Sequence, residues 1–126
     1  MEEKDLLNKI ERYLKNNHRE ISPVIYSTIP TVGETQANYY KLMISLILDR
    51  ARKELNDIKL IYTDASFVYI ACLSSLYEHK SNLSTTHTYK TGYLNNVPFY
   101  VSPYIKDRVG YILNSKGKIY KFQIID

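Results

Sequence analysis

Histidine and cysteine, two of the common metal ligands and nucleophiles of proteins, are scarce in this sequence. The three histidines, His18, His79 and His87, lie far apart, and Cys72 is the single cysteine. Protein metal sites draw their ligands from short spacings such as Cys-x-x-Cys or His-Glu-x-x-His, and the sequence contains neither. His79 and His87 flank a polar segment and can meet in space. We nevertheless expect no metal site, because three exposed histidines explain the pattern as well.

Nucleophilic and phosphate-binding motifs are also missing from the sequence. Cys72, Ser74 and Ser75 lie in an apolar segment, where a thiol packs as a small buried group and hydroxyls bond the helix backbone. No Gly-x-Ser-x-Gly motif occurs, and the four glycines are too isolated to form a phosphate-binding loop. We therefore expect neither an enzyme nor a cofactor. The alternative is an active site built from residues distant in sequence, because catalytic triads are defined by geometry.

Cations and tyrosines are interleaved in the C-terminal segment of the chain. Tyr104, Tyr111 and Tyr120 alternate there with five basic residues, which are Lys106, Arg108, Lys116, Lys118 and Lys121. Basic side chains contact phosphates and aromatic rings stack on bases, so the mixture is typical of a nucleic-acid surface. An ordinary solvated sheet face with half-buried tyrosines gives the same pattern. The formal net charge of +4 permits an anionic partner without requiring one.

The elements that position these residues begin with an N-terminal arm. Apolar residues recur at helical spacing between Glu2 and Asn17, which predicts an amphipathic helix. A connector with helix-breaking Pro and Gly residues follows from Ile21 to Thr35, and residues 24–26 within it favour a short extended piece. We therefore interpret residues 1–35 as an arm outside the compact unit, which spans residues 36–126.

Two further helices are predicted in the first part of the compact unit. The clearer one runs from Gln36 to Leu55, where apolar residues recur every three or four positions and cations occupy the last turns. Residues 58–62 favour a short strand. Thr63 or Asp64 then supplies a side-chain oxygen that caps the next helix. That helix is expected over residues 65–78 and is apolar enough to be half-buried.

The remaining sequence predicts β structure after a polar loop. Residues 79–92 are rich in Ser, Thr, Asn and His and favour a loop or an extended excursion. Strands are expected over residues 97–101, 108–113 and 118–125, with Asn- and Gly-containing turns beside them. The predicted fold class is therefore α+β, with an N-terminal helix, a long central helix, a strand–helix unit and a C-terminal antiparallel sheet.

A set of turn and strand residues marks the C-terminal half of the chain. They are Gly92, Leu94, Val97, Tyr100, Pro103, Tyr104, Asp107, Gly110 and Tyr111. Together they resemble the end of a tailed-phage major capsid protein, most closely those of T-even-type phages. Ser102 stands where that family usually has Asp, and the final glycine comes only at Gly117. Residues 60–66 with the apolar segment after them resemble the capsid axial domain, and the helix over 36–55 resembles the spine helix. The resemblance thus covers roughly residues 36–126.

This resemblance implies a viral structural protein, or a capsid-derived domain, that acts by packing against other chains. Such proteins bury strand edges and helix faces against neighbours, and symmetry multiplies modest contacts. The partners would be copies of the same chain, in a homo-oligomer, or other virion proteins, and the location would be the virion or the host cytoplasm. A whole capsid subunit is longer than this chain. The alternative function is a small nucleic-acid-binding module that uses the basic, Tyr-rich C-terminal sheet.

Membrane insertion is not expected from the sequence. No segment is apolar over the length that a bilayer-spanning helix requires. The first residues, Met1 to Asp5, are acidic and lack the apolar core of a signal peptide. We therefore expect no membrane partner.

Overall fold

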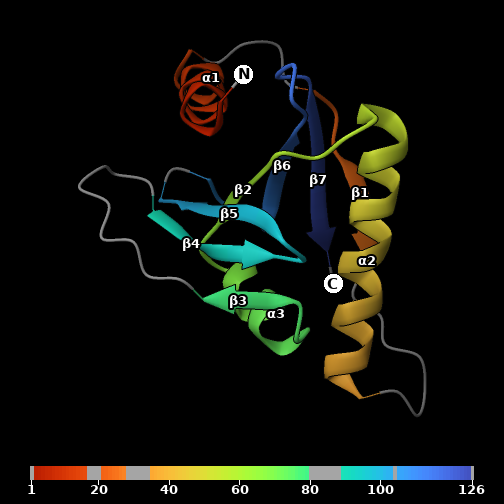
Figure 1. Cartoon of the computed structure of the whole chain (residues 1–126). Helices are drawn as coiled ribbons and strands as arrows, with labels where there is room; N and C mark the ends of the chain where they lie inside the picture. Colours follow the sequence, from red (N-terminus) through yellow and green to blue (C-terminus); the bar gives the residue numbers. More distant parts are fainter. Residues whose placement is uncertain (1, 17–20, 28–34, 80–88, 104, 126) are drawn as a thin grey trace.

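A computed structural model of the chain describes residues 2–16, 21–27, 35–79, 89–103 and 105–125 (Figure 1). The α+β class is confirmed, since helices and a seven-stranded sheet are both present. The helices are α1 (Glu3–Lys15), α2 (Gln36–Leu55) and α3 (Phe67–Leu73). The strands are β1 (Val24–Ser27), β2 (Leu60–Asp64), β3 (Tyr77–His79), β4 (Tyr89–Leu94), β5 (Val97–Ser102), β6 (Val109–Leu113) and β7 (Ile119–Ile125).

The sheet is mixed, with the strand order β1-β7-β6-β2-β5-β4-β3. The prediction of an antiparallel sheet is therefore wrong for two of the pairings, because β1 runs parallel to β7 and β2 runs parallel to β5. The physical reason lies in β2, which is buried along its whole length. A strand covered on both faces belongs in the middle of a sheet, and β2 enters between β5 and β6, parallel to one and antiparallel to the other.

Helices cover both faces of this sheet. The helices α2 and α3 pack on one face, where Ile44 and Ile47 of α2 share a buried cluster with Phe67 of α3 and with Phe99 and Phe122 of the sheet. The helix α1 packs on the other face, in a second buried cluster (Figure 1). The stripe of apolar residues along α2 explains its position, since it recurs at the period of the helix. The predicted central helix thus lies along a sheet that contains the last three strands.

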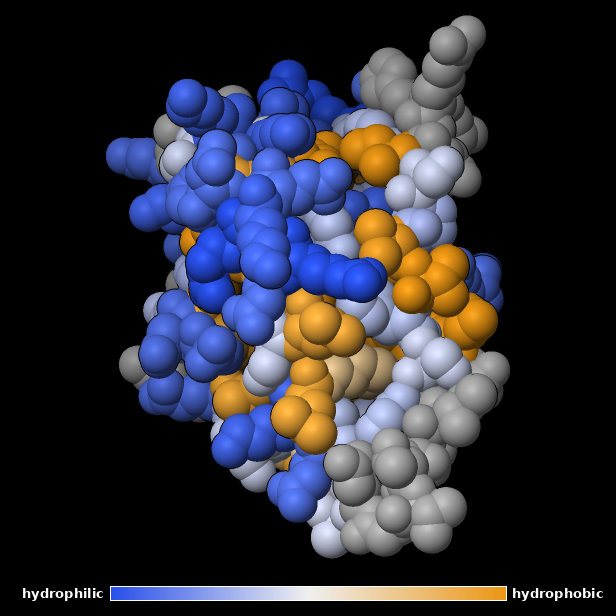
Figure 2. Space-filling view, turned by 90° about the vertical axis from the view of Figure 1, so that its right-hand side faces the viewer, coloured by the Kyte–Doolittle hydropathy of each residue, from blue (hydrophilic) through white to orange (hydrophobic). Residues whose placement is uncertain are grey.

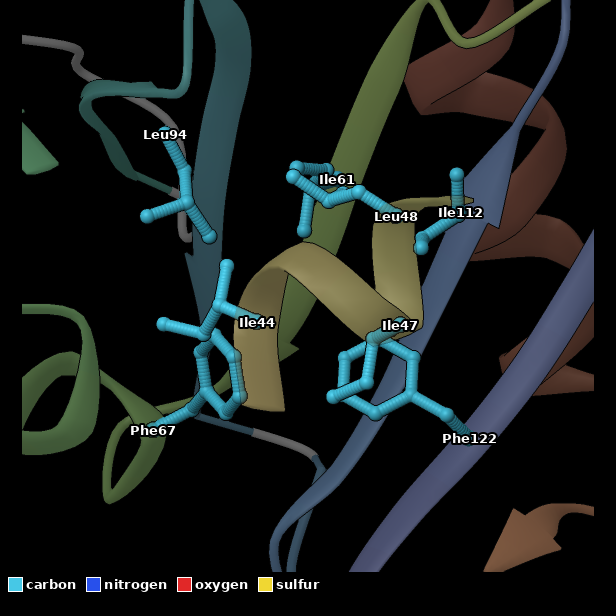
Figure 3. A pocket seen from close by; sticks show the side chains of 8 residues that line it. All are labelled: Ile44, Ile47, Leu48, Ile61, Phe67, Leu94, Ile112 and Phe122. Carbon is cyan, nitrogen blue, oxygen red and sulfur yellow. The ribbon is translucent and has the colours of Figure 1, made fainter. Parts of the chain in front are cut away.

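The main core encloses only a very small void. Its volume is about 10 Å³, and Figure 3 shows aliphatic and aromatic side chains of α2, α3 and the sheet pointing into it. A buried water molecule needs comparable space and polar partners as well. The lining offers no polar side chain, as it consists of Ile44, Ile47, Leu48, Ile61, Phe67, Leu94, Ile112 and Phe122. The void is therefore a packing defect and offers no room for a ligand.

Residues 1–35, which were expected to form an arm, contribute helix α1 and strand β1 to the fold. Strand β1 pairs with β7 in the register Val24 to Phe122 and Tyr26 to Ile124. The hydroxyl groups of Tyr26 and Tyr120 form a buried hydrogen bond of 2.6 Å. The Tyr39 hydroxyl of α2 donates to the Ser27 carbonyl at the end of the strand. Strand β1 is thus held to both layers of the fold.

The structure also corrects the segment between α3 and β5. The third helix ends at Leu73 rather than near residue 78, because the Ser74 hydroxyl bonds the Ala71 carbonyl at 2.6 Å and Ser75 takes a positive φ of 65°. A turn follows and leads into β3. The loop predicted over 79–92 is instead partly sheet, because β3 and β4 pair antiparallel at both of its ends. The remainder of that loop, residues 80–88, lies outside the described residues.

Candidate functional site

Helix α1 is attached to its face of the sheet by apolar and polar contacts. Leu6 and Ile10 lie on one side of the helix and are buried against sheet residues. The Tyr100 hydroxyl of β5 donates a 2.8 Å hydrogen bond to a carboxylate oxygen of Glu3. Burial, and next this hydrogen bond, raise the pKa of Tyr100 well above its ordinary value. The first turns of α1 are thereby fixed on the sheet.

A groove of about 1370 Å³ opens beside the later turns of α1. It runs between that helix, the connector at Pro23, and the sheet with the turn that precedes β6. Its lining includes both polar and apolar groups, which are Asn8, Glu11, Arg12, Leu14, Lys15, Pro23, Tyr62, Ile105, Lys106, Asp107, Val109, Tyr111, Lys121 and Gln123. The groove combines a large space with charged side chains and is therefore the candidate functional site.

Positive charge dominates the lining of the groove. Arg12, Lys15 and Lys106 are exposed to solvent, and Lys121 adds a fourth cation that is only 7% exposed. The acids in the lining are Glu11 and Asp107, so four cations face two carboxylates. The Lys121 ammonium lies 5.7 Å from the centre of the Tyr111 ring, within the range of a cation–π contact. The groove is therefore suited to an anionic group.

The five predicted nucleic-acid contacts do not come together. Lys106 and Lys121 line the groove, whereas Lys116 and Lys118 are exposed in the turn at the opposite end of the β6–β7 hairpin. The five residues of β6 separate Lys106 from that turn by about 17 Å, and Lys121 lies between them, paired with Tyr111. Arg108 is half-buried at the start of β6, and its backbone N–H is bonded to Asp64. The sequence cluster is thus divided between two places.

The tyrosines near these cations are not placed to stack on bases. Tyr111 is 5% exposed and Tyr120 is 4% exposed, while Tyr104 lies outside the described residues. Burial, followed by the hydrogen bond with Tyr26, raises the pKa of Tyr120 above its ordinary value. Base stacking needs an accessible ring face. Neither Tyr111 nor Tyr120 presents one, and both serve as core residues of the sheet.

The residues that carry the capsid resemblance take structural positions. Leu94, Val97 and Tyr100 are buried in β4 and β5. Gly110 in β6 lies beneath the Phe122 ring, and a Cβ atom there would come within 2.1 Å of it. Gly92 lies at an irregularity between β4 and β5, Pro103 follows β5, and Asp107 has a positive φ of 64°, whereas Tyr111 is buried in the middle of β6.

Asp64 is a buried acid that holds several groups together. Its carboxylate accepts hydrogen bonds from the Phe67 N–H at 3.1 Å and from the Arg108 N–H at 2.8 Å. The Ser66 hydroxyl lies 3.0 and 2.9 Å from its two oxygens. The sequence predicted Asp64 or Thr63 as a helix cap; the N-cap residue of α3 is Ser66, which makes no side-chain cap bond, and Asp64 instead accepts the N–H of Phe67 from the end of β2. The bond to Arg108 joins β2 to the corner before β6 and has no sequence signal.

The remaining candidate metal ligands and nucleophiles are the His, Cys and Ser side chains. Within the described ranges, no group of three His, Cys, Asp or Glu side chains is placed to hold a metal ion. His18 and His87 lie outside those ranges, and His79 belongs to β3. Ser74 bonds back to its own helix, as predicted. Cys72 is exposed, so its interpretation as a buried residue is wrong. The helix α3 turns Cys72 outward because Phe67, Ile70 and Ala71 occupy its inner face.

Sequence reasoning did not identify the groove, because α1 was expected to extend away from the sheet. The available signal was the pair Arg12 and Lys15, which lie three residues apart and therefore on one side of a helix.

Among the described helices, none is long and apolar enough to cross a membrane. No protein family matches the sequence, and no curated protein or solved structure gives a significant match to this chain.

Proposed function

We propose that this chain is a non-catalytic structural domain that packs against other protein chains, with a second copy of itself as its first partner. The observation that carries the proposal is the open edge of the sheet at β1. Among the described strands, β1 pairs only with β7. An edge strand presents backbone N–H and C=O groups that can pair with another chain. The capsid resemblance points the same way, since it implies a virion protein that assembles with its own copies.

The β1 edge is four residues long and lacks two of the usual features that prevent edge-to-edge pairing. Natural proteins protect such edges with charged residues, proline, bulges or very short strands. Val24–Ser27 contains neither a charge nor a proline. The opposite edge strand, β3, is only three residues long and includes Glu78. Of the two sheet edges, β1 is therefore the better template for a partner strand.

Exposed apolar side chains lie beside this edge. Ile25 is 48% exposed and Ile125 is 44% exposed. Ile25 is paired with Gln123, and Ile125 lies two residues further along β7, so both isoleucines are on the same face of the sheet. Leu42 and Leu46 of α2 are also exposed, one helical turn apart. Figure 2, which looks onto the α2 side of the molecule, shows apolar patches among hydrophilic groups.

A two-fold axis beside β1 supplies a simple geometry for self-association. Two copies of one strand related by such an axis run antiparallel, and each contributes the same surface. Their backbone groups would pair as in other cases of strand addition. The exposed Ile25 side chains of the two copies would meet across the axis. Each sheet would then continue into its neighbour.

The mass of the protein in solution tests this proposal, by light scattering over a range of concentrations. We expect the wild-type chain to form a dimer or a larger assembly. Ile25→Lys should yield monomers, because a lysine at an edge opposes pairing. Tyr69→Lys places the same charge on another exposed residue, 61% exposed on α3, and should associate like the wild type. A wild-type chain that stays monomeric at high concentration contradicts the proposal, as does unchanged association of Ile25→Lys.

The non-catalytic part of the proposal draws support from the bonds of the polar core residues. The Asp64 carboxylate is occupied by hydrogen bonds to its surroundings, and the Ser74 hydroxyl bonds its own helix.

The alternative, a nucleic-acid-binding module, has less support. Its cations are divided between the groove and the turn of a hairpin, and Tyr111 and Tyr120 are buried.

A further inference from the structure

The groove beside α1 is too large for a typical small-molecule site. Pockets for small ligands measure about 300–1,000 Å³, whereas this groove has a volume of about 1370 Å³ and is open to solvent. A segment of another macromolecule fills such a space better than a metabolite. The groove lies on the α1 face of the sheet, so its occupation does not require pairing at the β1 edge.

The charges of the groove define the chemistry of the occupant. Arg12 and Lys15 lie about one turn apart on α1, and Lys106 projects from the turn that precedes β6. These three cations belong to two separate elements on either side of the groove and are all exposed. We propose that the groove binds an extended, acidic segment of a partner polypeptide. This inference adds a second partner surface to the proposed function and does not depend on self-association.

The apolar part of the lining favours a polypeptide over a nucleic acid. Leu14 and Val109 are half-buried in the groove, and Ile105 and Pro23 lie beside them. An extended peptide presents alternate side chains to opposite sides, so apolar side chains can face Leu14 and Val109 while carboxylates reach the cations. A single-stranded nucleic acid gains affinity from stacking on aromatic rings. The tyrosine rings in the lining, Tyr62 and Tyr111, are buried.

Fluorescence anisotropy tests the proposal with a labelled peptide of alternating glutamate and valine. We expect saturable binding that weakens about tenfold in Arg12→Glu and in Lys106→Glu, because each reversal replaces an attraction by a repulsion. Lys53→Glu is the matched control, since it makes the same charge change at an exposed position of α2, on the other face of the sheet. It should bind the peptide as the wild type does. Circular dichroism checks that every variant is folded.

Three results would overturn the proposal. The first is absence of saturable binding of the peptide to the full-length wild-type chain. The second is an equal loss of affinity in Lys53→Glu, which would mean that only net charge attracts the peptide. The third is tighter binding of a labelled single-stranded RNA than of the peptide, together with weaker RNA binding by the Lys106→Glu protein. That result would assign the groove to nucleic acid. Peptide binding is measured on the wild-type chain whatever its oligomeric state, so failure of self-association leaves this test intact.

Discussion

Replacement of Asp64 by alanine should strongly destabilise the fold, because its carboxylate holds several groups together. The carboxylate is 4% exposed and accepts the N–H groups of Phe67 and Arg108. Alanine leaves both donors without this acceptor, and each orphaned buried group costs about 1–3 kcal/mol. Because the Arg108 N–H is only partly buried, we expect a loss of about 2–4 kcal/mol. A domain is stabilised by about 5–15 kcal/mol in total.

Urea denaturation followed by circular dichroism measures this change in the free energy of unfolding. Asp49→Ala is the control, because the Asp49 side chain is 68% exposed in a surface ion pair with Arg52, and it should cost less than about 1 kcal/mol. Asp64→Asn should lie between the two, since one amide oxygen replaces two carboxylate oxygens as acceptors. If Asp64→Ala unfolds within about 1 kcal/mol of Asp49→Ala, the reasoning about buried donors is refuted.

Two more predictions concern the core and the attachment of α1. Gly110→Ala should cost about 1–3 kcal/mol in thermal or urea unfolding, because its Cβ atom would come within 2.1 Å of the buried Phe122 ring. The loss of stability caused by Phe122→Leu should be smaller in the Gly110→Ala protein than in the wild type. Equal losses in the two proteins would refute the steric explanation. The raised pKa of Tyr100 means that the folded state holds this proton more tightly than the unfolded state. Its contribution to stability is complete below about pH 10 and is lost as the pH rises further. Tyr100→Phe should reduce the alkaline loss of stability measured by urea unfolding, and an identical pH profile would count against the Tyr100 bond to Glu3.

Local sequence signals predicted the long helix and the tight turns, although the third helix is shorter than predicted and β3 and β4 were not predicted. The helix from Gln36 to Leu55 was predicted with its observed bounds, because its apolar residues recur at the period of the helix. The turn at residues 114–117 was also predicted, and Gly117 there takes a positive φ of 81°. Asn95 and Asn96 likewise have positive φ values at the turn between β4 and β5. These features depend on residues that are close together in sequence.

Pairings between distant segments could not be predicted in the same way. Nothing in the residues of β2 indicates that it lies between β5 and β6, since a buried strand shows only that both its faces are covered. The groove was missed for a related reason, because it depends on where α1 is placed. The bond from Tyr100 to Glu3 joins residues 97 positions apart. The cations of the C-terminal segment look like one cluster in sequence, but the fold divides them between the groove and a hairpin turn.

The parallel pairing of β1 with β7 has a consequence for biosynthesis. Val24 meets Phe122, and Ser27 meets Ile125, so β1 can pair only after the whole segment between it and β7 has been synthesised. Contacts between such distant residues require closure of a long loop, which slows folding. Tyr26 and the apolar side of α2 therefore stay without β7 until that segment has been made. During that interval the nascent chain exposes the surfaces on which a chaperone would act.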